Sequence, residues 1–183
     1  MRAHQLSFLP PPRLEHGGET RPKRRKLARP IDPKRPLHVV LRSSRARGNW
    51  SLLHPRHKGR VYGLVESISE RYDVRVYRFA NVGNHVHLLV QAKSRKNFQA
   101  FLRVLSGAIA FVVTGAKKGN PVGRFWDHLA YSRVVGWGKD FDRVRNYLIL
   151  NLLEGFGVLK RGVGEPEIVS LESLRQRCAR LRL

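Results

Sequence analysis

Two histidines separated by a single residue have the side-chain type and the spacing of a metal-binding pair. His85 and His87 begin a segment of β-branched and aliphatic residues that ends near Ala92, and this composition predicts a strand. Side chains on a strand alternate between its two faces, so both imidazoles point one way while Val86 points into a core. Two neighbouring imidazoles are a common way to present nitrogen ligands to a divalent metal. The alternative is a pair of partly exposed histidines on a sheet face.

A tyrosine and an asparagine, one helical turn apart, form the second candidate group. Residues 140–154 are expected to form a helix that ends at Gly155. The buried stripe expected of this helix contains Phe141, Val144, Leu148 and Leu152. Tyr147 and Asn151 share the face beside this stripe, because they occupy positions i and i+4. If the helix packs on the sheet, that edge reaches the histidines; otherwise the tyrosine completes the core and the asparagine lies near the helix end.

A third motif combines a cation, two aromatic rings, a carboxylate and a histidine. It runs Arg124-Phe125-Trp126-Asp127-His128. Side chains of these types stack on bases or bind DNA. The favoured interpretation is aromatic core packing at the start of a strand, which leaves Asp127 and His128 as possible members of a site.

Seven predicted elements must position these candidates. Strands are expected at residues 37–41, 74–82, 85–92 and 129–135, and helices at about 61–72, 96–113 and 140–154. The first six elements match the split βαβ arrangement of ferredoxin-like folds. The predicted fold class is therefore α+β with the order βαββαβα, an antiparallel sheet of four strands, and helices packed on one face.

The chain of 183 residues is expected to be one folded domain between two basic segments. Residues 1–36 contain three consecutive prolines and a run of four Lys and Arg residues, so they are expected to be a disordered arm. This arm is either a solvated tail or a contact to a DNA backbone. Residues 37–158 form the predicted domain, and residues 159–183 form a basic tail.

Net charge is the most unusual property of the composition. Lys and Arg number 36 and Asp and Glu number 13, which gives a formal net charge of +23. Such an excess indicates a polyanionic partner, with nucleic acid favoured over an anionic membrane surface. No run of about 18 apolar residues is found, which argues against a membrane-spanning helix. A single cysteine, Cys178, excludes an intramolecular disulfide and a cysteine-based zinc site and suits a reducing cytoplasm.

Taken together, the three motifs resemble those of single-tyrosine HUH transposases of the insertion-sequence-200/605 type. The closest resemblance is to REP-associated tyrosine transposases, whose members carry a "PNHVHLL" strand, then "RFWEH", then a helix with "YIxxNP" and a glycine. The matching segments here are 83–89, 124–128 and 147–152, followed by Gly155. The resemblance spans about residues 37 to 158. Gly83 and Leu152 stand where the two motifs usually have proline.

The resemblance implies a role for each matching position. His85 and His87 would bind Mg²⁺ or Mn²⁺, Tyr147 would be the nucleophile, and Asn151 would be a third metal ligand. The implied activity is that of a DNA endonuclease and strand transferase that cuts single-stranded DNA, next to a hairpin, through a covalent 5′-phosphotyrosine. The implied setting is the bacterial cytoplasm, at the nucleoid and without a membrane partner, and relatives include both monomers and homodimers.

Basic residues of the second helix and the following linker are candidates for gripping the DNA. They are Arg95, Lys96, Arg103, Lys117, Lys118 and Arg124. Analogy with the family indicates that such surfaces hold a hairpin beside the cleavage point, and binding is then expected to weaken as salt rises. The alternative is a solvated basic face with no ligand.

Two other classes of function stay open. A non-catalytic nucleic-acid-binding protein with a ferredoxin-like sheet explains the charge and the fold, but it gives no reason for the histidine pair and Tyr147. A metal-dependent hydrolase that attacks phosphodiesters with water needs the histidines but does not need the tyrosine. Two imidazoles alone would also suit Zn²⁺ or Cu²⁺, and oxygen ligands from Asn151, phosphate and water shift the preference to Mg²⁺ or Mn²⁺.

Overall fold

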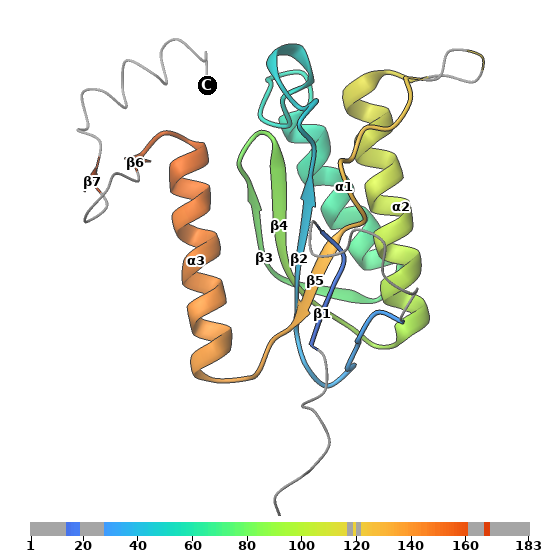
Figure 1. The fold of residues 1–183 in the computed structure, drawn as a ribbon, viewed down its shortest axis with the longest axis vertical. Helices are drawn as coiled ribbons and strands as arrows, with labels where there is room; N and C mark the ends of the chain where they lie inside the picture. The colour runs from blue at the N-terminus through green and yellow to red at the C-terminus, as the bar shows by residue number, and fades with distance from the viewer. Residues whose placement is uncertain (1–13, 19–27, 117–118, 120–121, 161–166, 169–183) are drawn as a thin grey trace, which may run out of the picture.

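The computed structural model of the protein describes residues 14–18, 28–116, 119, 122–160 and 167–168 (Figure 1). The strands of its main sheet are β1 (Glu15–His16), β2 (Leu37–Arg42), β3 (Val74–Asn81), β4 (His85–Ala92) and β5 (Tyr131–Val134). The helices are α1 (Lys58–Arg71), α2 (Arg95–Thr114) and α3 (Lys139–Gly155). A two-stranded sheet pairs β6 (Leu159–Lys160) with β7 (Glu167–Ile168).

The main sheet has the strand order β1-β5-β2-β4-β3, and every neighbouring pair is antiparallel. Without β1, this is the order that the split βαβ arrangement produces, because α1 and α2 each connect two strands that are not adjacent in the sheet. The predicted α+β class and ferredoxin-like arrangement are therefore confirmed, and each of the seven predicted elements is present within a few residues of its expected bounds.

The short strand β1 was not expected from the sequence, which placed residues 15 and 16 in the basic arm. Glu15 pairs with Arg133 and His16 pairs with Ser132 of β5. Gly18 N also donates to Leu129 O at 2.9 Å, and Val134 N donates to Leu14 O at 2.9 Å. A strand of two residues has no periodicity to detect, and its pairing partner lies more than a hundred residues away. Residues 1–13 and 19–27 of the predicted arm lie outside the described residues.

The helices lie on both faces of the sheet, whereas the sequence analysis placed them on one. Buried side chains of β2 and β4, including Val39 and Leu88, form the main core with α1 and α2. Leu89 points to the other face, where it is buried with Val144 and Leu148 of α3. Because β4 carries apolar side chains at consecutive positions, both of its faces need cover. Figure 1 shows the sheet between α3 and the other two helices.

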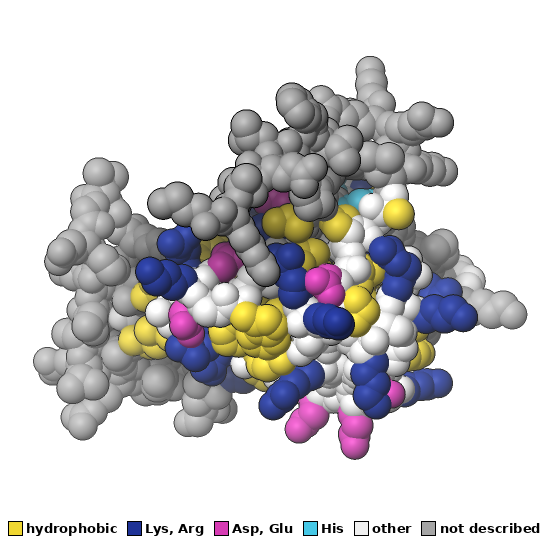
Figure 2. Space-filling view, turned by 90° about the horizontal axis from the view of Figure 1, so that it is seen from below, with side chains coloured by type: hydrophobic (Ala, Val, Ile, Leu, Met, Phe, Trp, Pro, Cys, Tyr) yellow, Lys and Arg dark blue, Asp and Glu magenta, His cyan; other side chains and the backbone are white. Residues whose placement is uncertain are grey.

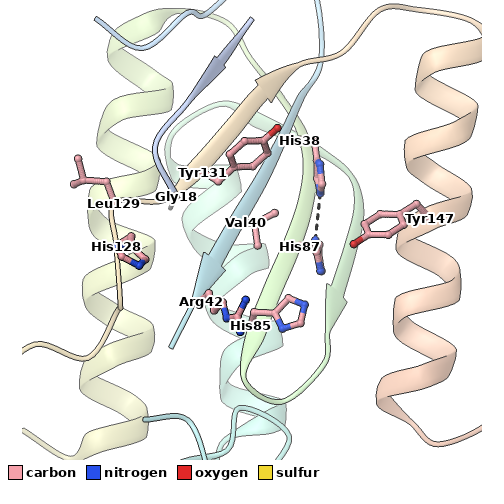
Figure 3. Close-up of a pocket in the computed structure, with 10 residues that line it drawn as sticks. All are labelled: Gly18, His38, Val40, Arg42, His85, His87, His128, Leu129, Tyr131 and Tyr147. Carbon is pink, nitrogen blue, oxygen red and sulfur yellow. Dashed lines mark hydrogen bonds between the residues drawn. The ribbon is translucent and has the colours of Figure 1, made fainter. Parts of the chain in front are cut away.

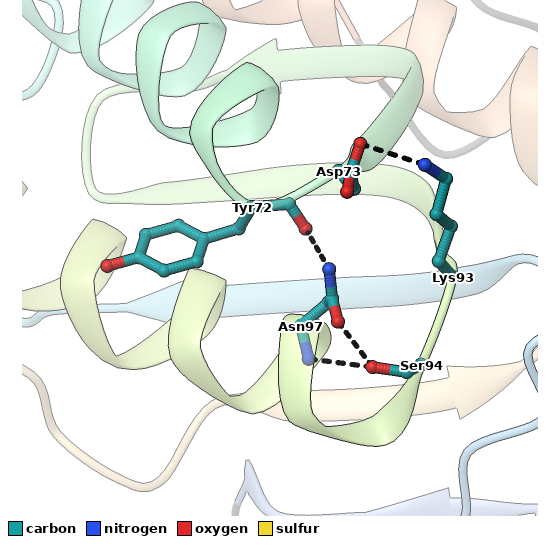
Figure 4. Close-up of polar contacts among 5 residues, drawn as sticks. All are labelled: Tyr72, Asp73, Lys93, Ser94 and Asn97. Atoms are coloured by element: carbon teal, nitrogen blue, oxygen red, sulfur yellow. Dashed lines mark hydrogen bonds and ion pairs between the residues drawn. The ribbon is translucent and has the colours of Figure 1, made fainter.

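Polar contacts tie the end of α1 to the start of α2 (Figure 4). Ser94 caps α2 by accepting from Asn97 N at 3.1 Å, and Asn97 Nδ2 donates to Tyr72 O at 2.8 Å. Lys93 Nζ lies 3.1 Å from Asp73 Oδ1, but both side chains are largely exposed, so this ion pair contributes little to stability. The cap and the amide bond fix the ends of the β3–β4 hairpin, which carries the histidine pair.

Helix α2 is long and apolar enough to cross a membrane, by length and composition alone, with a mean hydropathy of 1.4 over an 18-residue window. The core helix of a globular domain passes the same test. One face of α2 packs into the main core through Phe98, Phe101, Leu105, Ile109 and Val113. Packing within the domain thus accounts for this face of α2, and 28% of the window is buried.

Candidate active site

A pocket of about 370 Å³ opens on the α3 side of the sheet (Figure 3). It is lined by Gly18, His38, Val40, Arg42, His85, His87, His128, Leu129, Tyr131 and Tyr147. These residues come from β2, β4, β5, α3, the loop before β5 and the segment after β1. Imidazoles and phenols therefore share one cavity, and three of the residues singled out in the sequence, His85, His87 and Tyr147, meet there.

His85 and His87 lie side by side on β4, as the alternation of the strand predicted. Their ring centroids are 4.7 Å apart, with His87 buried and His85 half-buried. Nδ1 of His85 lies 2.6 Å from Oδ1 of Asn84. Because an amide oxygen accepts, this bond places the proton on Nδ1 and leaves the lone pair of Nε2 available to a ligand. Burial lowers the pKa of His85, Arg42 lowers it further, and Glu154 acts in the opposite direction. His85 is therefore neutral at neutral pH and suited to donate a lone pair.

His38 of β2 is a site residue that the sequence analysis did not select. Its Nε2 lies 3.2 Å from Nδ1 of His87, and the two rings are nearly parallel with centroids 5.5 Å apart. Burial, and secondarily Arg133, lowers the pKa of His38 to about 4, so its imidazole is neutral. A neutral His38 can accept a hydrogen bond from Nδ1–H of His87, which would leave Nε2 of His87 as the coordinating nitrogen.

Tyr147 stands on α3 with its ring at the edge of the histidine cluster. Its ring centroid is 5.5 Å from that of His87 and 6.1 Å from that of His38, and both pairs are nearly perpendicular. The residue is 39% exposed, so it does not complete the core, which was the alternative interpretation. Figure 3 shows its hydroxyl on the side that faces the histidines. A phenol in this position is accessible to a ligand in the pocket.

A second tyrosine, Tyr131 of β5, lines the same pocket but has different surroundings. Burial raises the pKa of Tyr131 to about 12, and the charge of Glu15 and a side-chain hydrogen bond to it act in the same direction. A raised pKa opposes formation of the phenolate, which is the nucleophilic form. Of the two phenols in the cavity, Tyr147 is the better candidate nucleophile.

Asn151 lies one turn after Tyr147 and is buried, with a relative exposure of 5%. Its Nδ2 donates to the backbone oxygen of Tyr147 at 2.6 Å. Asn151 is not among the residues that line the pocket. With the amide nitrogen bonded to the helix, Oδ1 is the atom through which this side chain would bind a ligand.

Gly155 allows the end of α3 to lie against the turn between β3 and β4. A Cβ added at this position would be 2.9 Å from Asn81 O and 3.1 Å from Val82 Cα. We predict that Gly155→Ala lowers the free energy of unfolding by about 1–3 kcal/mol, because backbone must move to relieve the overlap. Denaturant unfolding measures the effect.

Gly107→Ala is the matched control, since a Cβ at Gly107 in α2 meets nothing within 4 Å. This substitution is expected to leave stability unchanged or to raise it by about 0.4–1 kcal/mol, because alanine reduces the entropy of the unfolded chain. Equal effects of the two substitutions would show that close approach of α3 does not constrain Gly155.

Asp127 and His128 are the two residues that the sequence left as possible site members, and only His128 lines the pocket. Asp127 accepts from Ser44 N at 2.9 Å and from Ser44 Oγ at 2.8 Å, so its role is to hold the loop after β2. Phe125 is buried in the main core and Trp126 packs against it, in agreement with the favoured interpretation of this motif.

Of the predicted DNA-binding residues that the structure describes, three lie on α2 and Arg124 lies in the segment between α2 and β5. Lys96 and Arg103 are exposed on α2, and Arg95 Nη1 donates to Arg29 O at 2.7 Å. Arg124 is exposed and its Nε donates to Trp126 O at 2.8 Å. Lys117 and Lys118 lie outside the described residues.

A second hollow links this basic side to the pocket. It is lined in part by Arg29 and Arg103, and it shares His128 and Leu129 with the pocket that holds the histidines. Arg42 extends positive charge into that pocket, opposite His85 in the pairing of β2 with β4. Positive side chains therefore occur on both sides of the loop before β5, a charge distribution that suits a nucleic acid.

The donor set of the pocket supplies part of a metal site. Within the described ranges, no group of three or more His, Cys, Asp or Glu side chains could hold a metal ion. The neighbouring imidazoles of His85 and His87 fit as two nitrogen ligands, and the pocket has room for oxygen ligands from outside the histidine cluster.

Comparison with models of known protein families identifies the family of this chain. A family model described as "Transposase IS200 like" matches residues 35–149, a segment that includes His38, His85, His87 and Tyr147. The match ends before Asn151. A search of curated proteins gave no match.

Proposed function

Because the chain belongs to the IS200-like transposase family, we propose that it cuts and rejoins single-stranded DNA with Tyr147 as the nucleophile. Family membership itself identifies a transposase, with DNA as its partner and, in general, a divalent metal ion. The observation that carries the finer proposal is the meeting of Tyr147 with His85 and His87 in one pocket. The experiment that tests it is detection of a covalent adduct between Tyr147 and single-stranded DNA after denaturation.

The proposed reaction exchanges one phosphodiester for another. The phenol oxygen of Tyr147 bonds to phosphorus, and the bond from phosphorus to the 3′ oxygen breaks. Tyr147 gives up one proton and the leaving oxygen gains one, so the products are a 5′-phosphotyrosine and a strand ending in a 3′-hydroxyl. Because the tyrosyl ester is still a phosphodiester, attack by a strand end reverses the step and rejoins DNA.

His85 and His87 would hold the metal in this proposal, with Asn151 Oδ1 as a third ligand and phosphate oxygens and water as the others. Mg²⁺ and Mn²⁺ accept such mixed nitrogen and oxygen ligands. When bound, the ion would withdraw charge from a non-bridging phosphate oxygen and thereby activate phosphorus. A phenol is a weak nucleophile at neutral pH, so activation of the phosphate is needed.

His38 acts in this proposal as a positioning residue for His87. We predict that His38→Phe weakens binding of Mn²⁺ by roughly 10- to 100-fold, because it removes the acceptor at 3.2 Å from His87 Nδ1 but keeps a ring of similar shape. Calorimetric titration with Mn²⁺ measures the change.

His38→Gln is the rescue variant, since a carboxamide oxygen can accept the same hydrogen bond. It is expected to recover part of the Mn²⁺ affinity, whereas a purely steric role of His38 predicts no recovery. Wild-type affinity in the Phe variant would exclude the positioning role.

DNA binding in the proposal uses the positive side chains on both sides of the loop before β5. The hollow lined by Arg29 and Arg103 joins the pocket at His128 and Leu129, so one DNA molecule can contact both. This arrangement supports a hairpin held on the α2 side while its single-stranded extension enters the pocket. A transposase that acts on the chromosome is expected in the cytoplasm, and the charge of +23 supports association with the nucleoid.

The lining of the pocket supports this proposal over a non-catalytic binding protein. A sheet that only binds single strands presents aromatic rings on its central strands, on which the bases stack. The central strands β2 and β4 here present His38, Val40, His85 and His87 to the pocket instead. These side chains favour catalysis over base stacking on the sheet itself.

A further inference from the structure

Three aromatic rings form a cluster at the N-terminal end of α3, outside the pocket. Trp137 lies 5.2 Å from Phe141 and 5.8 Å from Tyr77, and Tyr77 lies 5.3 Å from Phe141, all between ring centroids. Tyr77 and Phe141 are partly buried against Leu89 and its neighbours. The cluster is thus built on the same face of the sheet as the histidines.

Trp137 is the exposed member of this cluster, at 52% relative exposure. Its ring is nevertheless held in place, because Nε1 donates to Lys34 O at 2.9 Å and one side contacts Phe141. An indole that is fixed and half in water loses little entropy on binding a flat ligand. Such a ring is suited to stack on a planar group.

Positive side chains surround the aromatic cluster. The Arg75 guanidinium lies 5.2 Å from the centre of the Tyr77 ring. Lys34, whose backbone oxygen accepts from Trp137, and Lys139, two residues after Trp137, are both exposed. The carboxylate nearest to Trp137 in the sequence, that of Asp140, is engaged by Arg133 at 3.0 Å. Figure 2 shows this end of the molecule, where hydrophobic side chains lie among Lys and Arg and some Asp and Glu side chains.

The cluster lies within reach of a strand that is bound at Tyr147. Phe141 and Tyr147 stand on the same helix, where six residues correspond to a rise of about 9 Å. A stacked strand advances about 3.4 Å for each nucleotide, so the separation is on the order of two to three nucleotides.

We propose that Trp137, supported by Phe141 and Tyr77, is a stacking platform for an unpaired base on the single strand that passes through the pocket. Arg75, Lys34 and Lys139 would contact the phosphates around this base. An aromatic ring next to cations is the pattern of a site for single strands, since bases stack on the ring and phosphates pair with the charges. A protein interface, by contrast, is depleted of charge at its centre. The inference rests on the proposed function of Tyr147.

Binding to a fluorescent single-stranded oligonucleotide tests the platform. The measurement uses the full chain with Tyr147→Phe and EDTA, so that no cleavage occurs. Adding Trp137→Ala is expected to raise the Kd roughly 5- to 150-fold, the effect of losing one base–aromatic stack. Trp137→Phe keeps a ring at the site and is expected to have a smaller effect.

Phe111→Ala on α2 is the matched control, because Phe111 is a similarly exposed aromatic residue at 56%. It is expected to leave the Kd unchanged. Equal losses in the two alanine variants would overturn the platform, as would unchanged binding after Trp137→Ala. If Trp137→Ala instead converts a dimer into a monomer in light scattering, the patch is an interface between copies and the proposal is wrong.

A scan of abasic sites locates the stacked base. In the chain with Trp137, removal of one base two to three nucleotides from the cut is expected to weaken binding, and the same removal should have no further effect with Trp137→Ala. A persistent effect would overturn the assignment. Adduct formation by the chain with native Tyr147 is measured separately, so failure of the platform leaves the nuclease proposal standing. Failure of the nuclease proposal shows as a missing adduct, which is a different readout from the Kd.

Discussion

Replacing Tyr147 with phenylalanine is expected to abolish the covalent protein–DNA adduct, a loss of more than roughly 1,000-fold against the native chain. The ring contacts with His87 and His38 are available to phenylalanine, so the pocket is expected to stay folded. Only the oxygen that bonds to phosphorus is removed. A denaturing gel of the protein with a labelled single-stranded oligonucleotide and Mn²⁺ measures the adduct.

Tyr131→Phe is the matched control, because Tyr131 is the other phenol that lines the pocket. Its pKa, raised to about 12, disfavours it as a nucleophile, so adduct formation is expected to survive its loss. An adduct that persists in the Tyr147 variant but disappears in the Tyr131 variant would reassign the nucleophile. Cleavage without any adduct in the native chain would indicate a hydrolase that uses water.

The parts of the site that could be predicted from sequence are those fixed by local periodicity. Alternation along β4 put His85 and His87 on one face, and the 3.6-residue repeat of α3 put Tyr147 beside the buried stripe. Each of these placements needs only neighbours in the chain. The histidine rings do lie together, and Tyr147 does lie at their edge.

The parts that could not be predicted depend on pairing between distant segments. His38 reaches His87 because β2 aligns with β4 in one register, in which Val40 pairs with His87. A shift of one residue would turn His38 into the main core, and nothing local to β2 specifies the register. Strand β1 could not be predicted for the same reason, because its two residues are a strand only through their pairing with β5.

The face of the sheet on which α3 packs also could not be predicted from local sequence. A histidine pair on the solvent side of a sheet looks exposed as long as every helix is assumed to cover the other side. Leu88 and Leu89 are both fully buried, which requires cover on both faces, and α3 supplies the second layer. With α3 packed on this face, the surface of the sheet becomes one wall of a pocket, and Tyr147 of α3 lines the same pocket.

Replacing both His85 and His87 with alanine is expected to remove binding of Mn²⁺ and, with it, adduct formation on single-stranded DNA. Loss of one group that only orients a ligand lowers metal affinity by about 10- to 100-fold, so loss of two ligands is expected to exceed 100-fold. Calorimetric titration with Mn²⁺ measures the first effect and the denaturing gel measures the second.

The control for this double variant must separate metal binding from folding and from DNA binding. His54→Ala removes an imidazole outside the pocket and is expected to keep both Mn²⁺ affinity and adduct yield. His85→Ala alone is the milder test, since His85 is half-buried whereas His87 is 3% exposed and contributes to packing.

If the double variant folds, binds DNA and still forms the adduct in EDTA, the imidazoles are not metal ligands and Tyr147 must be activated without an ion. If the adduct is lost but Mn²⁺ still binds, the ion occupies another site and the histidines act directly on the phosphate or the phenol.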